Sequence, residues 1–263
     1  MRFLSFTSGS CGNCALLLPE KGKGLLIDAG ISPRSVKRIL REKGLDEDCY
    51  DTIIVTHNHM DHVRFLGSFC KQRMPLVCAP SKLHGVLAGE PLMRDYIARN
   101  RLILRDGEWN RVGQFDIFFF EVKHDAAQTV GYALECEGHK VVFMTDLEAV
   151  PPIALEFASQ ADTVVIESNY DYDMLIHGDY PPQLKRRILD EGHLSNDDAA
   201  AAIKSFCSDN LRNLFLCHLS GNNNTPRLAY DCARAALVEA GAEEGRVSLR
   251  VLPRGVPSPV VTL

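Results

Sequence analysis

The sequence predicts an α/β protein that folds as one domain. Runs of branched apolar residues with the length of buried strands recur along the chain, for example Thr52–Val55, Leu76–Ala79 and Thr163–Glu167. Segments with helical spacing of apolar residues lie between several of these runs. Hydrophobic residues make up 46% of the 263 residues, which is ample for a sizeable core. Because neither a linker nor a low-complexity tract divides the chain, we expect a single domain over residues 1–263.

The first two predicted strands, residues 3–6 and 14–18, are joined by a short polar loop. Residues 7–13 of this loop include two glycines and three hydroxyl residues. They form either a plain hairpin turn or a turn whose backbone N–H groups point at one anion. In the second case the candidate substrate contacts are Ser8, Ser10 and Asn13.

The next predicted strand ends in an acid and is followed by a helix. The strand begins at Gly24 and ends at Asp28, whose carboxylate is placed to support neighbouring side chains by hydrogen bonds. Ser32 is a typical helix N-cap, and Pro33 suits the first helical position. One side of this helix is basic. It is either a solvated face or a contact for a polyanion, formed by Arg34, Lys37, Arg38 and Arg41.

Four potential metal ligands lie within six positions directly after the strand Thr52–Val55. These are His57, His59, Asp61 and His62, and a helix over roughly 61–73 is expected to follow. Imidazole and carboxylate ligands without thiolate suit zinc, manganese or iron. Because the chain turns at this point, one loop can direct two ligands towards each of two adjacent ions.

Further acids and histidines follow other predicted strands. His124 comes after a strand over 115–122, Asp146 ends a strand that begins at Lys140, and His218 ends a strand that begins at Leu214. Side chains at the same end of neighbouring strands converge, so these residues are expected to meet the histidine loop. The intervening residues 80–91 are expected to be irregular.

The histidine loop resembles the His-x-His-x-Asp-His signature of metallo-β-lactamase-fold hydrolases. The segment Gly192–Asn196 is similar to a motif of the RNase Z group. The segments Ser8–Asn13, His124–Tyr132 and His218–Ser220 together most resemble the YycJ (WalJ) group of bacterial proteins. The resemblance implies a four-layer αβ/βα sandwich with two divalent ions at one edge of its sheets, and phosphodiester chemistry that includes 5′-to-3′ DNA exonuclease activity.

This resemblance implies a full set of ligands for two ions. One ion is assigned to His57, His59 and His124, and the other to Asp61, His62 and His218, with Asp146 bridging them. Zinc is the favoured metal, with manganese or iron as alternatives. Asp28 takes a supporting part. Asp61 and His193 are the candidate catalytic residues.

The predicted reaction is hydrolysis of a phosphodiester, in nucleic acid or a small molecule, by attack of a metal-bound hydroxide. His193 is not needed as a ligand, so it is the candidate general acid for the leaving group. A thioesterase or lactonase is the alternative, because the same hydroxide attacks carbonyls. A di-iron oxidoreductase is disfavoured because His59 is intact, and a non-catalytic scaffold is disfavoured because no ligand is missing.

Bulk properties restrict the partners and the compartment. The net charge of −5 argues against a basic coat over the whole surface, although bound cations would make the site locally positive. No stretch is long and apolar enough to span a bilayer, and the N-terminus has no signal-peptide pattern. We therefore expect a cytoplasmic protein without membrane contact. The odd number of nine cysteines favours reduced, structural thiols, and Cys11-x-x-Cys14 alone is a weak zinc signal.

Overall fold

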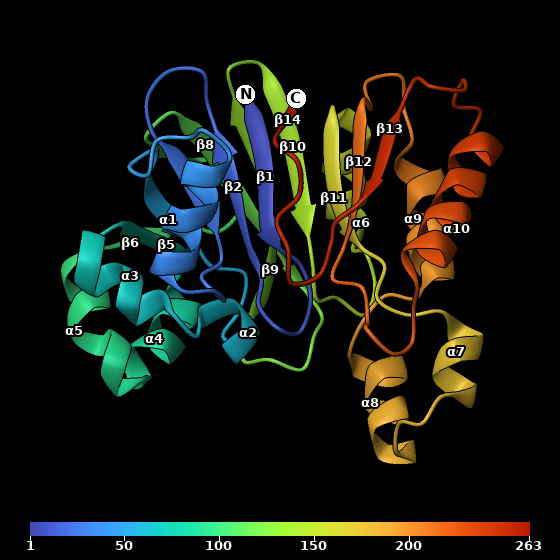
Figure 1. Ribbon diagram of the computed structural model, residues 1–263, viewed down its shortest axis with the longest axis horizontal. Helices are drawn as coiled ribbons and strands as arrows, with labels where there is room; N and C mark the ends of the chain where they lie inside the picture. The colour runs from blue at the N-terminus through green and yellow to red at the C-terminus, as the bar shows by residue number, and fades with distance from the viewer.

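Two seven-stranded sheets lie face to face in the computed structural model, and helices cover the outer face of each (Figure 1). The structure describes the backbone of residues 1–263 and the side chains of 1–90, 93–94, 97–190 and 192–263. The arrangement of helix, sheet, sheet and helix layers confirms the predicted α/β sandwich. No helix among the described residues has the length and apolar character needed to cross a bilayer.

The first sheet is built from the N-terminal part of the chain and closed by the C-terminal strand. Its order is β14 (Val261–Thr262), β1 (Arg2–Thr7), β2 (Cys14–Leu18), β3 (Gly24–Ile27), β4 (Tyr50–Ile54), β5 (Leu76–Pro80) and β6 (Arg101–Leu104). Strands β3 to β6 run parallel, so helices must connect them. These helices are α1 (Pro33–Glu42), α2 (Met60–Val63), α3 (Leu66–Arg73), α4 (Ser81–Gly89) and α5 (Pro91–Arg99).

The second sheet contains the strands that carry most of the remaining site residues. Its order is β13 (Ser248–Val251), β12 (Asn213–Cys217), β11 (Thr163–Glu167), β10 (His139–Met144), β9 (Thr129–Cys136), β8 (Phe115–Val122) and β7 (Asn110–Val112). Strands β10 to β13 are parallel, and β8 runs in the same direction because β9 is antiparallel to both β8 and β10. The helices of this half are α6 (Pro152–Gln160), α7 (Tyr172–His177), α8 (Pro182–Glu191), α9 (Asn196–Phe206) and α10 (Pro226–Glu239).

Three apolar clusters hold the layers together. Successive residues of a strand face opposite sides of the sheet, so Phe3 of β1 packs between the two sheets while Leu4 packs against the helices of the first half. A third cluster joins the second sheet to its helices and includes Phe206. Helices α7 and α8 lie beyond this core at the same end of the molecule as α2 (Figure 1), and they have a small apolar cluster of their own around Tyr170.

The structure differs from the sequence prediction in two helical regions. The helix expected over 61–73 is divided into α2 and α3, with Arg64 and Phe65 between them. The region expected to be irregular, residues 80–91, lies largely in α4 and at the start of α5. The predicted cap Ser32 is present at α1 and acts through its side-chain oxygen, and Ser195 caps α9 in the same way.

Candidate metal centre

The acids and histidines expected to converge all lie at the carboxyl ends of strands. Asp28 follows β3, His57 lies beyond the end of β4, His124 follows β8, Asp146 follows β10 and His218 follows β12. Asp28, Asp146 and His218 have positive φ angles of 64°, 54° and 53°, in the left-handed region that costs a non-glycine residue about 1–3 kcal/mol. The chain therefore turns sharply at these positions and directs each side chain into the gap between the sheets.

The first group of potential ligands consists of His57, His59 and His124. Their nearest ring nitrogens lie within 4.8 Å of one another, and His124 Nε2 is 3.3 Å from His59 Nδ1. His57 Nε2 is buried and has no hydrogen-bond partner. A buried nitrogen left without a partner is costly, so its position is consistent with a cation that the three imidazoles share.

The second group consists of Asp61, His62 and His218. Asp61 Oδ2 is 3.6 Å from His62 Nε2 and also 3.6 Å from His218 Nε2. His218 Nε2 is the second buried ring nitrogen in the site that has no hydrogen-bond partner. Each group thus contains a buried imidazole nitrogen without a hydrogen-bond partner, which fits a cation-binding site.

Asp146 lies between the two groups. Its Oδ2 is 3.2 Å from His62 Nε2, and its Oδ1 is 3.9 Å from His124 Nε2. Burial opposes ionisation of this carboxyl, but the neighbouring His218 and His62 outweigh it and hold the pKa of Asp146 well below its usual value. Oδ1 also lies 3.3 Å from His218 Nδ1, so this ionised carboxylate contacts histidines of both groups, as a bridging ligand would.

Outer contacts fix which nitrogen each histidine presents to the centre. The Nδ1–H of His62 donates to Asp28 Oδ2 at 2.7 Å, and that of His124 donates to the Gly192 carbonyl at 2.6 Å. His218 donates in the same way to Glu167 Oε1 at 2.8 Å. With Nδ1 occupied, Nε2 remains as the ligand atom in each case, which is the usual arrangement around protein-bound metals.

The loop between β1 and β2 supports the centre from the side of the first sheet. Ser8 Oγ accepts the backbone N–H of His218 at 2.8 Å. Asn13 Nδ2 lies 3.2 Å from Asp61 Oδ2 and 2.8 Å from His62 Nε2. Ser10 makes no contact with the ligand groups and instead lines the adjacent cleft. The structure therefore separates these three candidate contacts into two that hold ligands and one that faces the cleft.

Four histidines of the site have buried side chains, and their proton affinities are opposed. Burial lowers the pKa of both His57 and His124, so these imidazoles are neutral. Burial also opposes the charge on His62 and His218, but nearby carboxylates led by Asp146 outweigh it. They raise the pKa of His62 well above its usual value and that of His218 to about 10. The cluster therefore carries positive charge where ions would otherwise lie.

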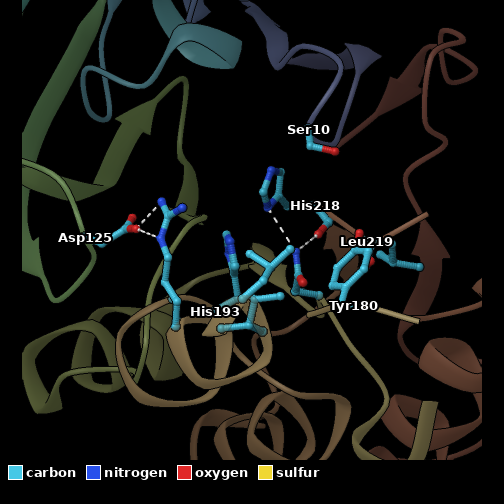
Figure 2. Close-up of a pocket in the computed structure, with 12 residues that line it drawn as sticks. Ser10, Asp125, Tyr180, His193, His218 and Leu219 are labelled. Carbon is cyan, nitrogen blue, oxygen red and sulfur yellow. Dashed lines mark hydrogen bonds and ion pairs between the residues drawn. The ribbon is translucent and has the colours of Figure 1, made fainter. Parts of the chain in front are cut away.

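A cleft of about 200 Å³ opens beside the two groups, and His193 and His218 point into it (Figure 2). The Nδ1–H of His193 donates to Glu167 Oε1 at 2.8 Å, which leaves Nε2 available to the cleft. Burial lowers the proton affinity of His193, but the Glu167 carboxylate outweighs it and raises the pKa of His193. The imidazole can thus hold a proton at the position nearest a bound molecule.

Two contributions to the site were missed by the sequence interpretation. Glu167 was noted only as an acid at a strand end. Its fully buried carboxylate accepts hydrogen bonds from His193, His218 and the backbone N–H groups of Leu147 and Leu194, so it aligns both histidines. Asp125 Oδ1 lies 3.2 Å from His124 Nε2, and its other oxygen is paired with Arg187 of α8. Only the position of Asp125 next to His124 could have indicated this.

Comparisons with known proteins agree with this geometry. The Beta-lactamase superfamily domain model matches residues 24–218. The chain is 33% identical over 242 residues to exodeoxyribonuclease YycJ of Bacillus anthracis. The aligned region covers 92% of this chain and 90% of that protein. It is 31% identical over 230 residues to exodeoxyribonuclease WalJ of Streptococcus pneumoniae, covering 87% and 85% of the two chains.

A solved structure shows the same fold at low sequence identity. Zn²⁺-bound PqqB from Methylobacterium extorquens superposes with a TM-score of 0.73 and 15% identity, over 98% of this chain and 99% of that one. At this identity the likeness concerns the fold alone, whereas the family model and the two exodeoxyribonucleases match in sequence. The chain therefore belongs to the beta-lactamase superfamily, as a hydrolase of the metallo-β-lactamase fold, and within it to the YycJ/WalJ family.

Proposed function

We propose that this chain is a phosphodiesterase that cleaves nucleic acid with two divalent metal ions. The observation that carries the proposal is the pairing of two adjacent ligand groups with a proton-bearing His193 at the mouth of one cleft. Relatives that match most of the chain are named exodeoxyribonucleases, which supports DNA as the substrate and release of nucleotides from an end.

The donor set fits two ions in the arrangement expected from the sequence. One ion would be held by His57, His59 and His124, the other by Asp61, His62 and His218, and Asp146 would bridge them. No thiolate belongs to either group of described residues, and a set of nitrogen and carboxylate donors favours zinc, with manganese or iron as alternatives. Two such ions lower the pKa of coordinated water to about 7 and neutralise charge on phosphoryl oxygens.

His193 supplies what the ions do not, a proton for the leaving oxygen. Its Nδ1 is fixed by Glu167, so its Nε2 can donate to an alkoxide as the phosphorus–oxygen bond breaks. Glu167 is a positioning residue, because its oxygens are already used by four donors of the protein. Hydrolysis of thioesters and lactones needs less help with the leaving group. The presence of His193 therefore favours a phosphodiester as the substrate.

Arg38 and Arg41 of α1 contribute little to the proposed substrate contact. Arg38 pairs with Glu42 at 2.7 Å and Arg41 pairs with Glu47 at 2.6 Å, and both guanidinium groups are mostly exposed. Paired charges on a solvated surface add little net attraction for a polyanion. The geometry supports the solvated-face interpretation of this helix.

The proposed function is tested by comparing substrates on the same metal-loaded preparation. We expect turnover of 5′-phosphorylated DNA and of bis-p-nitrophenyl phosphate, abolished by a chelator and restored by added Zn²⁺ or Mn²⁺. Rates on RNA, a thioester and a lactone measured alongside would define the preference. Faster hydrolysis of the thioester or lactone than of either phosphodiester would contradict the proposal.

Metal binding to this site should release protons and become tighter as pH rises. His218, with a pKa raised to about 10, and His62 carry protons in the metal-free chain at neutral pH and must lose them to act as ligands. The affinity for Zn²⁺ should therefore increase about tenfold per pH unit for each proton released between pH 6 and 8. Calorimetric titration in buffers with different protonation enthalpies measures the number of protons released. A pH-independent affinity without proton release would contradict the assignment of His62 and His218 as ligands.

A further inference from the structure

Arg254 lies on the segment that joins β13 to β14, next to the candidate active site, and its side chain is half-buried. Its guanidinium donates to the Leu219 carbonyl, to Ser10 Oγ and to Cys11 Sγ, each at 3.4 Å. The two contacts to oxygen are at the long end of hydrogen-bond distances, and a thiol sulfur is a weak acceptor. A guanidinium has five N–H donors in a fork that matches phosphate, so most of its bonding capacity is unused.

This arginine also has no acidic partner among the residues whose side chains the structure describes. The other arginine beside the cleft, Arg187, is paired with Asp125. A partly desolvated guanidinium with no carboxylate beside it keeps its charge available for an incoming anion. An anionic group of the substrate would provide the partner that the Arg254 guanidinium lacks.

The backbone around Arg254 is fixed to the loop that supports the metal centre. Ser8 N–H donates to the Pro253 carbonyl at 3.2 Å, and Gly255 N–H donates to Thr7 Oγ1 at 2.9 Å. Ser8 Oγ in turn accepts the N–H of His218. The loop around Ser8 thus contacts both the segment of Arg254 and the proposed ligand His218. Arg254 itself contacts Leu219, the residue that follows His218.

Two glycines leave room for the side chain. A Cβ at Gly9 would lie 3.0 Å from Arg254 Cγ, and one at Gly221 would lie 2.8 Å from Arg254 Cζ. Gly221 is exposed, and its φ is outside the left-handed region, so neither burial nor backbone conformation requires glycine there. The absence of a side chain at this position serves the placement of the guanidinium.

Ser10 and Leu219, which Arg254 contacts, line the same cleft as His193, and both are drawn in Figure 2. We propose that Arg254, with Ser10, binds a phosphate of the nucleic acid next to the one that is cleaved. Arg254 belongs to none of the ligand groups, so we assign it to a neighbouring phosphate rather than to the one at the metal centre. This inference rests on the proposed phosphodiesterase function and makes a polynucleotide, rather than a small diester, the substrate.

The test compares a substrate with several phosphates and one with a single phosphate. Wild type, Arg254→Met, Arg254→Lys and Gly221→Ala are assayed on a DNA oligonucleotide and on bis-p-nitrophenyl phosphate. Arg254→Met should reduce kcat/KM on DNA about 10- to 100-fold more than on the small diester, the size of a charge-assisted contact. Gly221→Ala should cause a similar loss by displacing the guanidinium, and Arg254→Lys a partial one. In the double variant the two losses should not add.

A binding measurement gives a second readout. The dependence of DNA affinity on salt should become less steep by about one counterion in Arg254→Met, because one phosphate contact is lost. Arg111→Met removes an equally charged, exposed residue from β7 and should change neither readout. Thermal unfolding of each variant checks the fold.

Each outcome decides between the possibilities. Equal losses on both substrates would place Arg254 at the scissile phosphate or in a merely structural role, and no loss on DNA would remove it from the substrate site; both results overturn the inference. If the wild type is active on the small diester and the variants cleave DNA as well as the wild type does, this inference alone is wrong. A wild-type protein inactive on both substrates defeats the proposed function and this inference with it.

Discussion

Replacing His193 with alanine should lower the rate of DNA hydrolysis by about 10²- to 10⁴-fold, the usual contribution of a general acid. The reason is the proton that Glu167 holds on this imidazole at the mouth of the cleft. The loss should depend on the leaving group. A deoxyribose alkoxide needs protonation as it departs, whereas p-nitrophenolate departs without it, so turnover of bis-p-nitrophenyl phosphate should fall much less.

The control for this prediction is a histidine remote from the site. His139 lies at the beginning of β10, at the opposite end from Asp146, and contacts Asp162. His139→Ala should leave both activities unchanged. Full turnover of DNA by His193→Ala would contradict the general-acid role, and equal losses on both substrates would indicate a structural role instead. Single-turnover rates on the two substrates provide the measurement.

Replacing Asp146 with asparagine should remove metal as well as activity. Asparagine keeps the shape of the side chain but lacks the charge that faces His62 Nε2 at 3.2 Å and His218 Nδ1 at 3.3 Å. Without a bridging carboxylate, two adjacent divalent ions repel each other. We expect the metal content to fall from about two ions per chain to one or fewer, and the activity to fall at least 100-fold, beyond the effect of losing an outer-shell partner.

Metal content is measured by elemental mass spectrometry after extensive dialysis. Asp116→Asn is the matched control, because this exposed acid of β8 pairs with Arg111 away from the site. It should retain the full metal content and activity. An Asp146→Asn protein with two ions per chain would exclude the bridging role, whereas one ion with full activity would favour a mononuclear mechanism.

The strand-end residues were predictable because a local signal marks them. Each of His124, Asp146 and His218 follows a run of apolar residues, and parallel strands bring such ends to one edge. The partners of these residues were not predictable in the same way. Glu167 contacts His193 and His218, and Arg254 contacts Leu219. These partners are distant in the chain, so only the three-dimensional structure reveals the contacts.

The helices α4 and α5 were missed for a different reason. Gly85, Gly89 and Pro91 suggest loop boundaries, and each lowers the helix propensity of its neighbourhood. Leu83 and Leu87 nevertheless follow a helical spacing and are buried. Packing of this apolar stripe against the first sheet outweighs the weak local propensity, since helices in proteins are stabilised mainly by tertiary contacts.

The left-handed backbone at Asp28, Asp146 and His218 has a consequence for how the molecule opens. Three sterically unfavourable conformations at a single edge lower the free energy of local opening there, while the apolar layer between the sheets stays closed. Ions that bind only the closed arrangement would stabilise it by mass action. Metal binding would therefore also suppress fluctuations of this edge, and amide hydrogens beside the three turns would exchange more slowly in the metal-bound chain than in the metal-free one.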